Sequence, residues 1–123
     1  MRLSNVLYIL GDETRLRILN LLTKQELCVC LIEETLNIPQ YNVSKHLIRL
    51  RNSGIITCRR IAQWCFYSID VSFKEQFQEL FDSFINLWKK DRQYLEDLQR
   101  LEYQLETNDC CKKLLQSLSN KSL

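Results

Sequence analysis

Hydrophobic and polar positions divide the chain into a helical first part, a short β segment and a long helical last part. Apolar residues recur every three or four positions up to about Leu50 and again from Phe73 to Leu105, which is typical of amphipathic helices. The residues from Ile55 to Ile69 are instead largely β-branched and aromatic, and Ala62-Gln63 lies in their middle. This segment predicts a two-stranded hairpin whose strands are Ile55–Ile61 and Trp64–Ile69.

Four helices are predicted before the hairpin. Gly11 separates the first two, and the carboxylate of Asp12 can accept hydrogen bonds from the first turn of the second. Asn37-Ile38-Pro39 ends the third helix and starts the fourth, which Ser53-Gly54 then ends. The four helices cover Leu3–Leu10, about Asp12–Thr23, about Leu27–Leu36 and about Gln40–Asn52. Two short helices with a tight link, followed by a hairpin, predict a mainly α fold with a β-hairpin wing, the winged helix-turn-helix.

The apolar stripe after Ser72 predicts one long helix. A domain of this size cannot cover such a stripe alone, so we expect the helix to pack against a second subunit. The alternative is an ordinary core helix. We therefore expect a winged helix-turn-helix domain for DNA binding and dimerisation over residues 1–106, followed by a cysteine-containing tail over residues 107–123.

Composition supports one helical domain. The chain has 123 residues, is 46% hydrophobic and 26% charged, and contains only two glycines and one proline. Neither a signal peptide nor an apolar run of the length that spans a membrane is recognised, so we expect a cytoplasmic protein with no membrane partner. In a reducing cytosol its six cysteines are expected to be thiols, and clustered thiols indicate metal ligands or redox centres.

Charge is distributed unevenly along the chain. No Asp or Glu occurs from Thr35 to Ile69, and acidic residues return after Phe73. The acid-free window carries Lys45, Arg49, Arg51, Arg59 and Arg60. A basic middle segment indicates a face that meets double-stranded DNA, although a solvated surface without acids would give the same pattern.

The fourth helix and the hairpin supply candidate DNA-binding residues. Amide, hydroxyl and guanidinium groups read base edges in the major groove and hold phosphates. The only histidine, His46, lies next to the apolar stripe and can contact phosphate, cap a neighbour or bind a metal. The candidates are Gln40, Tyr41, Asn42, Ser44, Lys45, His46 and Arg49 on the helix, and Arg59, Arg60 and Gln63 at or near the hairpin tip.

Residue sets typical of catalysis are not recognised. The sequence has no Ser/His/Asp combination, no paired carboxylates in an apolar frame and no glycine-rich loop for phosphate. We expect that the chain is not an enzyme.

Four segments resemble the ArsR/SmtB family of metal-responsive repressors. They are "DETRLRILNLL", "ELCVC", "NVSKHLIRLRNSGII" and "FYSI", within Asp12 to Ile69. "ELCVC" is specific for the thiolate-sensing branch, which responds to arsenite and antimonite or to cadmium and lead. The resemblance implies a homodimer built from the first and last helices. It also implies that the fourth helix reads operator DNA, and that the repressor leaves the DNA when metal binds.

The cysteine pattern departs from that family. The third cysteine of the best-known arsenite sensors is replaced by Glu33, and no cysteine precedes the first helix. The last helix has no histidine, so the family's zinc and nickel site looks absent. The chain instead carries Cys110-Cys111 in its tail, and the candidate metal ligands are therefore Cys28, Cys30, Cys110 and Cys111.

The spacing of Cys28 and Cys30 suggests how a metal would act. On a regular helix the two side chains lie about 200° apart, with Cys28 towards the core and Cys30 on the wet side beside Glu33 and Glu34. Thiolates from both on one As(III) or Sb(III), or alternatively on Cd(II) or Pb(II), would distort the helix that leads into the DNA reader. Whether the two tail cysteines join them is left open.

Other interpretations remain at this point. Cys58 and Cys65 lie on the two hairpin strands, where core packing is favoured over ligation. A thiol redox-sensing repressor of the same fold is the second functional interpretation. A protein-interaction domain built on the long helix is a further one.

Overall fold

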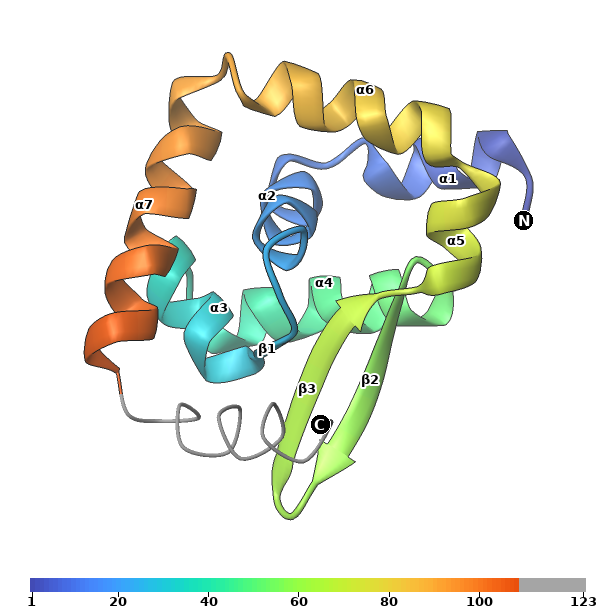
Figure 1. The fold of residues 1–123 in the computed structure, drawn as a ribbon. Helices are drawn as coiled ribbons and strands as arrows, with labels where there is room; N and C mark the ends of the chain where they lie inside the picture. Colours follow the sequence, from blue (N-terminus) through green and yellow to red (C-terminus); the bar gives the residue numbers. More distant parts are fainter. Residues whose placement is uncertain (109–123) are drawn as a thin grey trace, which may run out of the picture.

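Helices α3 and α4, joined by a short link and followed by a β-hairpin, form the winged helix-turn-helix that the sequence predicts (Figure 1). The computed structural model describes residues 1–108. None of the helices in that range combines the length and apolar character needed to cross a membrane. The elements are α1 Leu3–Leu10, α2 Glu13–Leu22, β1 Leu27–Cys28, α3 Val29–Leu36, α4 Gln40–Asn52, β2 Ile56–Ile61, β3 Trp64–Ile69, α5 Val71–Gln76, α6 Gln78–Trp88 and α7 Arg92–Thr107.

The ends of α2, α3 and α4 follow the local chemistry predicted for them. Asp12 Oδ2 accepts a hydrogen bond of 3.0 Å from the backbone N–H of Arg15, which caps α2. Asn37 ends α3 in the left-handed conformation at φ 54°, which asparagine tolerates better than most residues. Gly54 follows α4 at φ 79°, where a side chain would be strained. The predicted bounds of α1 and α4 are confirmed.

The predicted third helix is wrong at its start. Leu27 and Cys28 are extended, and they pair antiparallel with Tyr67 and Phe66 of β3. They form a third strand, so the sheet order is β1-β3-β2. The backbone groups of β3 gain hydrogen-bond partners on both sides, which outweighs the helical periodicity of two residues. Helix α3 therefore begins at Val29, and Cys28 is its N-cap rather than part of it.

The single long helix predicted after Ser72 is also wrong, because it is broken twice. Phe77 interrupts it at φ −115°, ψ 35°, and the chain turns again between Trp88 and Arg92. The rings of Trp88 and Tyr94 stack across the second turn, with their centroids 5.6 Å apart. This contact favours a bend over a continuous helix, since a straight helix would hold the two rings apart.

After the second turn, α7 runs back along the domain and packs against α2 and α3 of its own chain (Figure 1). Leu101, a member of the predicted apolar stripe, is 2% exposed within one chain, and the neighbouring Tyr94 is 4% exposed. This half of the stripe is therefore partly covered without a second subunit, although its member Leu95 is 42% exposed. The tail predicted for residues 107–123 lies outside the described residues, apart from its first two positions.

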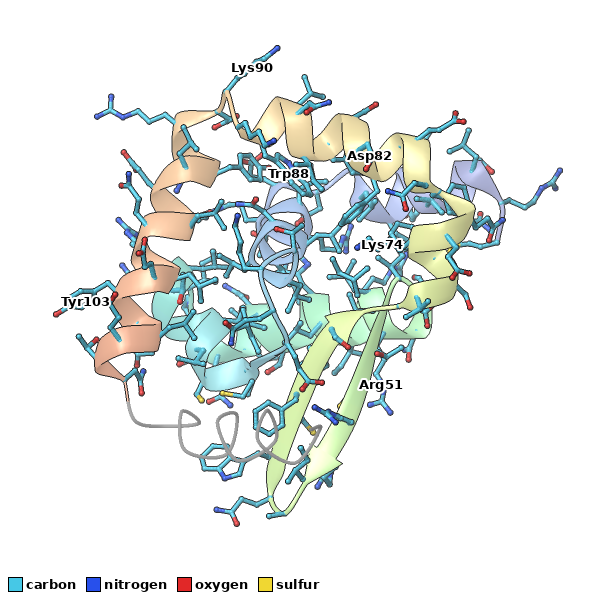
Figure 2. The ribbon with its side chains drawn as sticks, in the orientation of Figure 1. Arg51, Lys74, Asp82, Trp88, Lys90 and Tyr103 are labelled. Carbon is cyan, nitrogen blue, oxygen red and sulfur yellow. The ribbon has the colours of Figure 1, made fainter. Side chains whose placement is uncertain are left out.

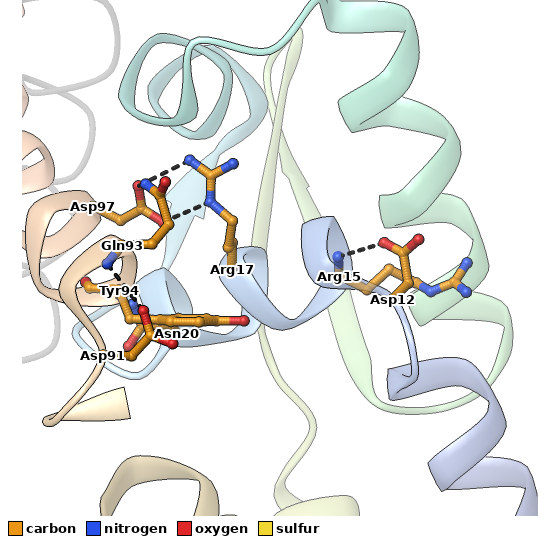
Figure 3. A network of polar contacts seen from close by, with 8 residues as sticks. All are labelled: Asp12, Arg15, Arg17, Asn20, Asp91, Gln93, Tyr94 and Asp97. Carbon is orange, nitrogen blue, oxygen red and sulfur yellow. Dashed lines mark hydrogen bonds and ion pairs between the residues drawn. The ribbon is translucent and has the colours of Figure 1, made fainter. Parts of the chain in front are cut away.

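A buried polar network holds α7 in place (Figure 3). Arg17 of α2 donates two hydrogen bonds to the Asp97 carboxylate, Nε to Oδ2 at 2.8 Å and Nη2 to Oδ1 at 3.0 Å. Gln93 donates a third, at 3.0 Å. The Asp97 side chain is 0% exposed and that of Arg17 14% exposed. Because the paired form is favoured, the hydrogen bond to Asp97 raises the pKa of Arg17 despite the opposing effect of burial.

Removing the Asp97 carboxylate should strongly destabilise the fold. We expect Asp97→Ala to lower the free energy of unfolding by about 3 kcal/mol, since it leaves a largely buried guanidinium without its partner. Urea denaturation followed by far-ultraviolet circular dichroism measures this. The control is Glu96→Ala, which removes the exposed 3.1 Å ion pair with Arg92 and should change little. Equal losses for the two variants would contradict the structural role assigned to Asp97.

Candidate DNA interface and thiol site

Helix α4 has one buried face and one polar face. Val43, Leu47 and Leu50 are 0% exposed and belong to the core, as the predicted stripe requires. This fixes the rotation of the helix, so most of its other residues face outward. Among the predicted DNA-binding residues, Gln40, Tyr41, Lys45, Arg49, Arg59, Arg60 and Gln63 are exposed, and Asn42, Ser44 and His46 are partly buried. The exposed set offers amide, phenol, ammonium and guanidinium donors on one helix and the adjoining hairpin.

Arg49 has an aromatic support that sequence reasoning missed. Its guanidinium carbon lies 5.8 Å from the centre of the Tyr8 ring, and Tyr8 itself is 72% exposed. A guanidinium over an aromatic face is attracted by the ring quadrupole. Helix α1 thus helps to position a cation on α4. No local sequence signal links the two residues, because they lie on separate helices.

Two of the predicted DNA-binding arginines lie on the wing, and only one of them has an ion-pair partner. Arg60 is exposed, whereas Arg59 donates to the carboxylate of Glu26, with 2.8 Å between Nε and Oε2. The hydrogen bond to Glu26 raises the pKa of Arg59. Glu26 comes directly before β1, so the ion pair joins that strand to the wing. Sequence reasoning missed Glu26, because its position depends on a strand that was taken for helix.

His46 lies largely inside the domain. Its side chain is 12% exposed, and its Nδ1 lies 3.8 Å from Asp12 Oδ2 without a hydrogen-bond partner in the described chain. Burial lowers the pKa of His46 from its usual 6.5, although the Asp12 carboxylate opposes this. The ring is therefore neutral at pH 7. DNA contact by His46 remains a prediction, and this placement leaves it little surface for such a contact.

Cys28 and Cys30 lie on either side of the junction between β1 and α3. Cys28 is 0% exposed and belongs to the core, as predicted. Cys30 is in the first turn of α3 and is half-buried against the core, so the wet side predicted for it is only partly exposed. Within residues 1–108, no three His, Cys, Asp or Glu side chains come together as a metal site. Cys110 and Cys111 lie outside the described residues.

Comparisons with known proteins agree with this arrangement. A model described as bacterial regulatory protein, arsR family, matches residues 12–57. An arsenic resistance transcriptional regulator of Pseudomonas putida is 41% identical over 61 residues, which cover 49% of this chain and 48% of that protein. The chain therefore spans about half the length of this relative. An arsenical resistance operon repressor of Staphylococcus xylosus is 31% identical over 80 residues, covering 65% of this chain and 77% of the repressor.

A solved structure shows the same architecture. HlyU from Vibrio cholerae is 30% identical and superposes with a TM-score of 0.56 over 65% of this chain and 94% of its own.

Acid should destabilise the domain through His46. Because the folded state lowers the pKa of His46 below 6.5, the unfolded state takes up the proton first as the pH falls. The contribution of this residue is therefore unfavourable below the unfolded pKa and absent well above it. We expect His46→Gln to lose less stability than the unaltered protein between about pH 7.5 and about pH 5.5, as measured by urea midpoints. Parallel pH profiles for the two proteins would contradict the buried neutral ring.

Proposed function

Because the chain belongs to the arsR family of bacterial regulatory proteins, we propose that it is a transcriptional repressor which binds operator DNA as a homodimer and is released by As(III) or Sb(III). The observation that carries the proposal is the position of Cys28 and Cys30 at the junction of β1 and α3. Two of the relatives are named as regulators of arsenic or arsenical resistance. Their names support a trivalent metalloid over other effectors.

DNA reading is assigned to α4 and the wing. The outward residues of α4, among them Gln40 and Lys45, would lie in the major groove, where their donors meet base edges and phosphates. The exposed Arg60 and Gln63 of the wing would lie against the neighbouring backbone. The segment from Thr35 to Ile69 contains no Asp or Glu, so it places no carboxylate that would repel the DNA phosphates.

The proposed release from DNA follows from the contacts that β1 and α3, the elements carrying Cys28 and Cys30, make with the wing and with α4. Cys28 is paired with Phe66 in β3, so a movement of its backbone acts on the wing. Cys30 is in the first turn of α3, which packs against α4. An ion that draws both sulfurs together must pull Cys28 from the core or twist this junction. Both DNA-reading elements would then shift at once, which is how a small site changes operator affinity.

Further thiolates are assigned to the tail. Trivalent arsenic and antimony favour three thiolates, and Cys28 and Cys30 supply two. We assign the third to Cys110 or Cys111, from the same subunit or its partner. The negative charge of bound thiolates is favoured at the start of a helix, where the backbone dipoles point their positive ends.

Dimerisation is assigned to α1 and α6. Leu3 and Leu7 of α1 are 52% and 48% exposed, and Leu87 of α6 is 63% exposed. Leu3 also lines a groove of about 560 Å³ together with Phe77 and Leu80. Exposed apolar residues on neighbouring helices fit a subunit contact. The family pairing of first and last helices is thus assigned to α6, because one face of α7 already packs against α2 and α3 of its own chain.

Release by arsenite tests the effector site. We expect Cys30→Ser to bind operator DNA like the unaltered protein and to need at least about tenfold more arsenite for half-release, as measured by fluorescence anisotropy of labelled operator in reducing buffer. The matched control is Cys65→Ser, whose thiol lies on the wing and should leave release unchanged. Normal release from Cys30→Ser would refute the site.

Further experiments on DNA release test the role of the tail cysteines and the choice of effector. Truncation after Thr107 should weaken arsenite release if Cys110 or Cys111 is a ligand, and unchanged release would remove the tail from the site. Release by cadmium or lead but not by arsenite would assign a different effector to the same cysteines. Release by peroxide without any metal would favour redox sensing.

The Glu26 carboxylate should restrain DNA binding by the wing. Glu26→Gln leaves Arg59 available to phosphate, so we expect tighter DNA binding and a salt dependence steeper by about one unit of slope. Titrations at several salt concentrations measure both. Glu96→Gln on α7 makes the same charge change far along the chain and serves as the control. An unchanged slope for Glu26→Gln would show that Arg59 does not meet phosphate.

A further inference from the structure

The wing holds a second pair of cysteines, separate from the junction of β1 and α3. In the β2–β3 register Cys58 lies opposite Tyr67, and Cys65 lies opposite Arg60. Residues that are paired across strands, or two apart along one, point to the same face of a sheet. Cys58 and Cys65 therefore share one face, on neighbouring strands, one diagonal step apart. Both side chains are half-buried thiols that solvent reaches.

The sheet separates this pair from Cys28. Cys28 is paired with Phe66, and Phe66 follows Cys65 directly along β3. Consecutive strand residues point to opposite faces. The wing thiols thus lie on one face and Cys28 on the other, so one ion cannot be bound by both groups.

The spacing fits a bridging atom better than a disulfide. Diagonal neighbours in an antiparallel pair have α-carbons about 7 to 8 Å apart, whereas disulfides need about 4.4 to 6.8 Å. An atom placed between the sulfurs, with bonds of about 2.3 Å to each, spans the additional distance. Burial and a side-chain hydrogen bond to Cys65 raise the pKa of the Cys58 thiol, which indicates that the two thiols lie within reach of each other.

Polar neighbours surround the pair. Arg51, at the end of α4, and Arg60 on β2 act on Cys58 in the direction that favours its thiolate. Tyr67 is paired with Cys58 across the two strands, and burial is the main reason that the pKa of its phenol is raised. Figure 2 labels Arg51 beside the hairpin. These cations offset only part of the effect of burial, since the pKa of Cys58 stays above its usual value, so the pair consists of partly sheltered thiols with two cations nearby.

We propose that Cys58 and Cys65 form a second thiophile site, which binds a trivalent arsenical carrying one organic substituent. Such an arsenical has two exchangeable hydroxyls and one arsenic–carbon bond that stays intact. Two arsenic–oxygen bonds break and two arsenic–sulfur bonds form. Each thiol proton leaves with a hydroxide as water, and arsenic stays trivalent.

The choice of an organic arsenical rests on the number of ligands. Within residues 1–108 no group of three His, Cys, Asp or Glu side chains could hold a metal ion, so the wing pair offers two protein ligands. Arsenite prefers three thiolates. A monosubstituted arsenical needs only two, because carbon already occupies its third position.

The test isolates the wing thiols. The variant Cys28→Ala, Cys30→Ser, Cys110→Ser, Cys111→Ser keeps only Cys58 and Cys65, and the probe is phenylarsine oxide in the presence of excess glutathione. We expect one equivalent to bind per chain and both thiols to become unreactive. Arg59 and Arg60 lie between the two cysteines in sequence, so trypsin separates their peptides. Mass spectrometry should then find the two peptides joined through one phenylarsenic group.

A matched control keeps two thiols in the wing but moves one of them to the other face of the sheet. Ser68 is paired with Thr57, so its side chain points away from the face of Cys58. Adding Cys65→Ser and Ser68→Cys to the isolated variant leaves two thiols on opposite faces. We expect binding about a hundredfold weaker or more, because the second thiolate no longer acts at high effective concentration.

The outcomes separate this proposal from the proposed function. The wing site would be overturned if both thiols stayed reactive after treatment, or if only one of them were blocked. Equal binding by the control with thiols on opposite faces would overturn it as well. If the isolated variant does not fold, the same peptide mapping on the full reduced protein decides, since the joined peptides identify the bridge. Release of operator by arsenite is measured separately and depends on Cys30, so either proposal can fail alone.

Discussion

The pairing of β1 with β3 is the constraint on which the rest of this structure depends. Two residue pairs, Leu27 with Tyr67 and Cys28 with Phe66, bring a segment that precedes the helix-turn-helix onto the wing that follows it. This pairing makes Cys28 extended and starts α3 at Val29. It also brings Glu26 to Arg59. Because Phe66 and Cys65 are consecutive, the same register places Cys28 and the wing thiols on opposite faces.

A second constraint acts on the other side of α3. In the ion pair of Arg17 with Asp97, the carboxylate is completely buried. This pair holds α7 against α2 and α3. Helix α3 is therefore packed between α4 on one side and α7 on another. A change at its first turn is passed on to packed neighbours, because interiors this dense deform little. Asn20 adds a 3.1 Å hydrogen bond to the backbone oxygen of Tyr94.

Local patterns predicted those parts of the fold that local energetics decide. The stripe of Val43, Leu47 and Leu50 and the turn residues around it were enough to place α4. Helix α3 was misplaced at its start, because Leu27 and Cys28 fit a helical period and only the distant strand β3 makes them extended. The bend after Trp88 contains neither glycine nor proline, and its one local signal is Asp91, whose carboxylate caps α7.

The candidate site shows the same limit. The outward set on α4 followed from its buried stripe, which is a local property. Asp97 looked like one acid among many on a solvated helix, since its partner lies 80 positions away. Glu26 and Tyr8 were missed for the same reason, because their contacts depend on how separate elements meet. Pairings of this kind require three-dimensional positions.

The distance in sequence between Arg17 and Asp97 also bears on the order of folding. Contacts between α2, α3 and α4 close short loops, whereas the 80-position separation closes a long one and costs more chain entropy. We therefore expect α7 to dock last, after the helix-turn-helix has formed. On the ribosome, α7 is made after the rest of the described domain. A newly made chain would then hold the helix-turn-helix folded for a short period while the side of α3 that α7 later covers is still open to solvent.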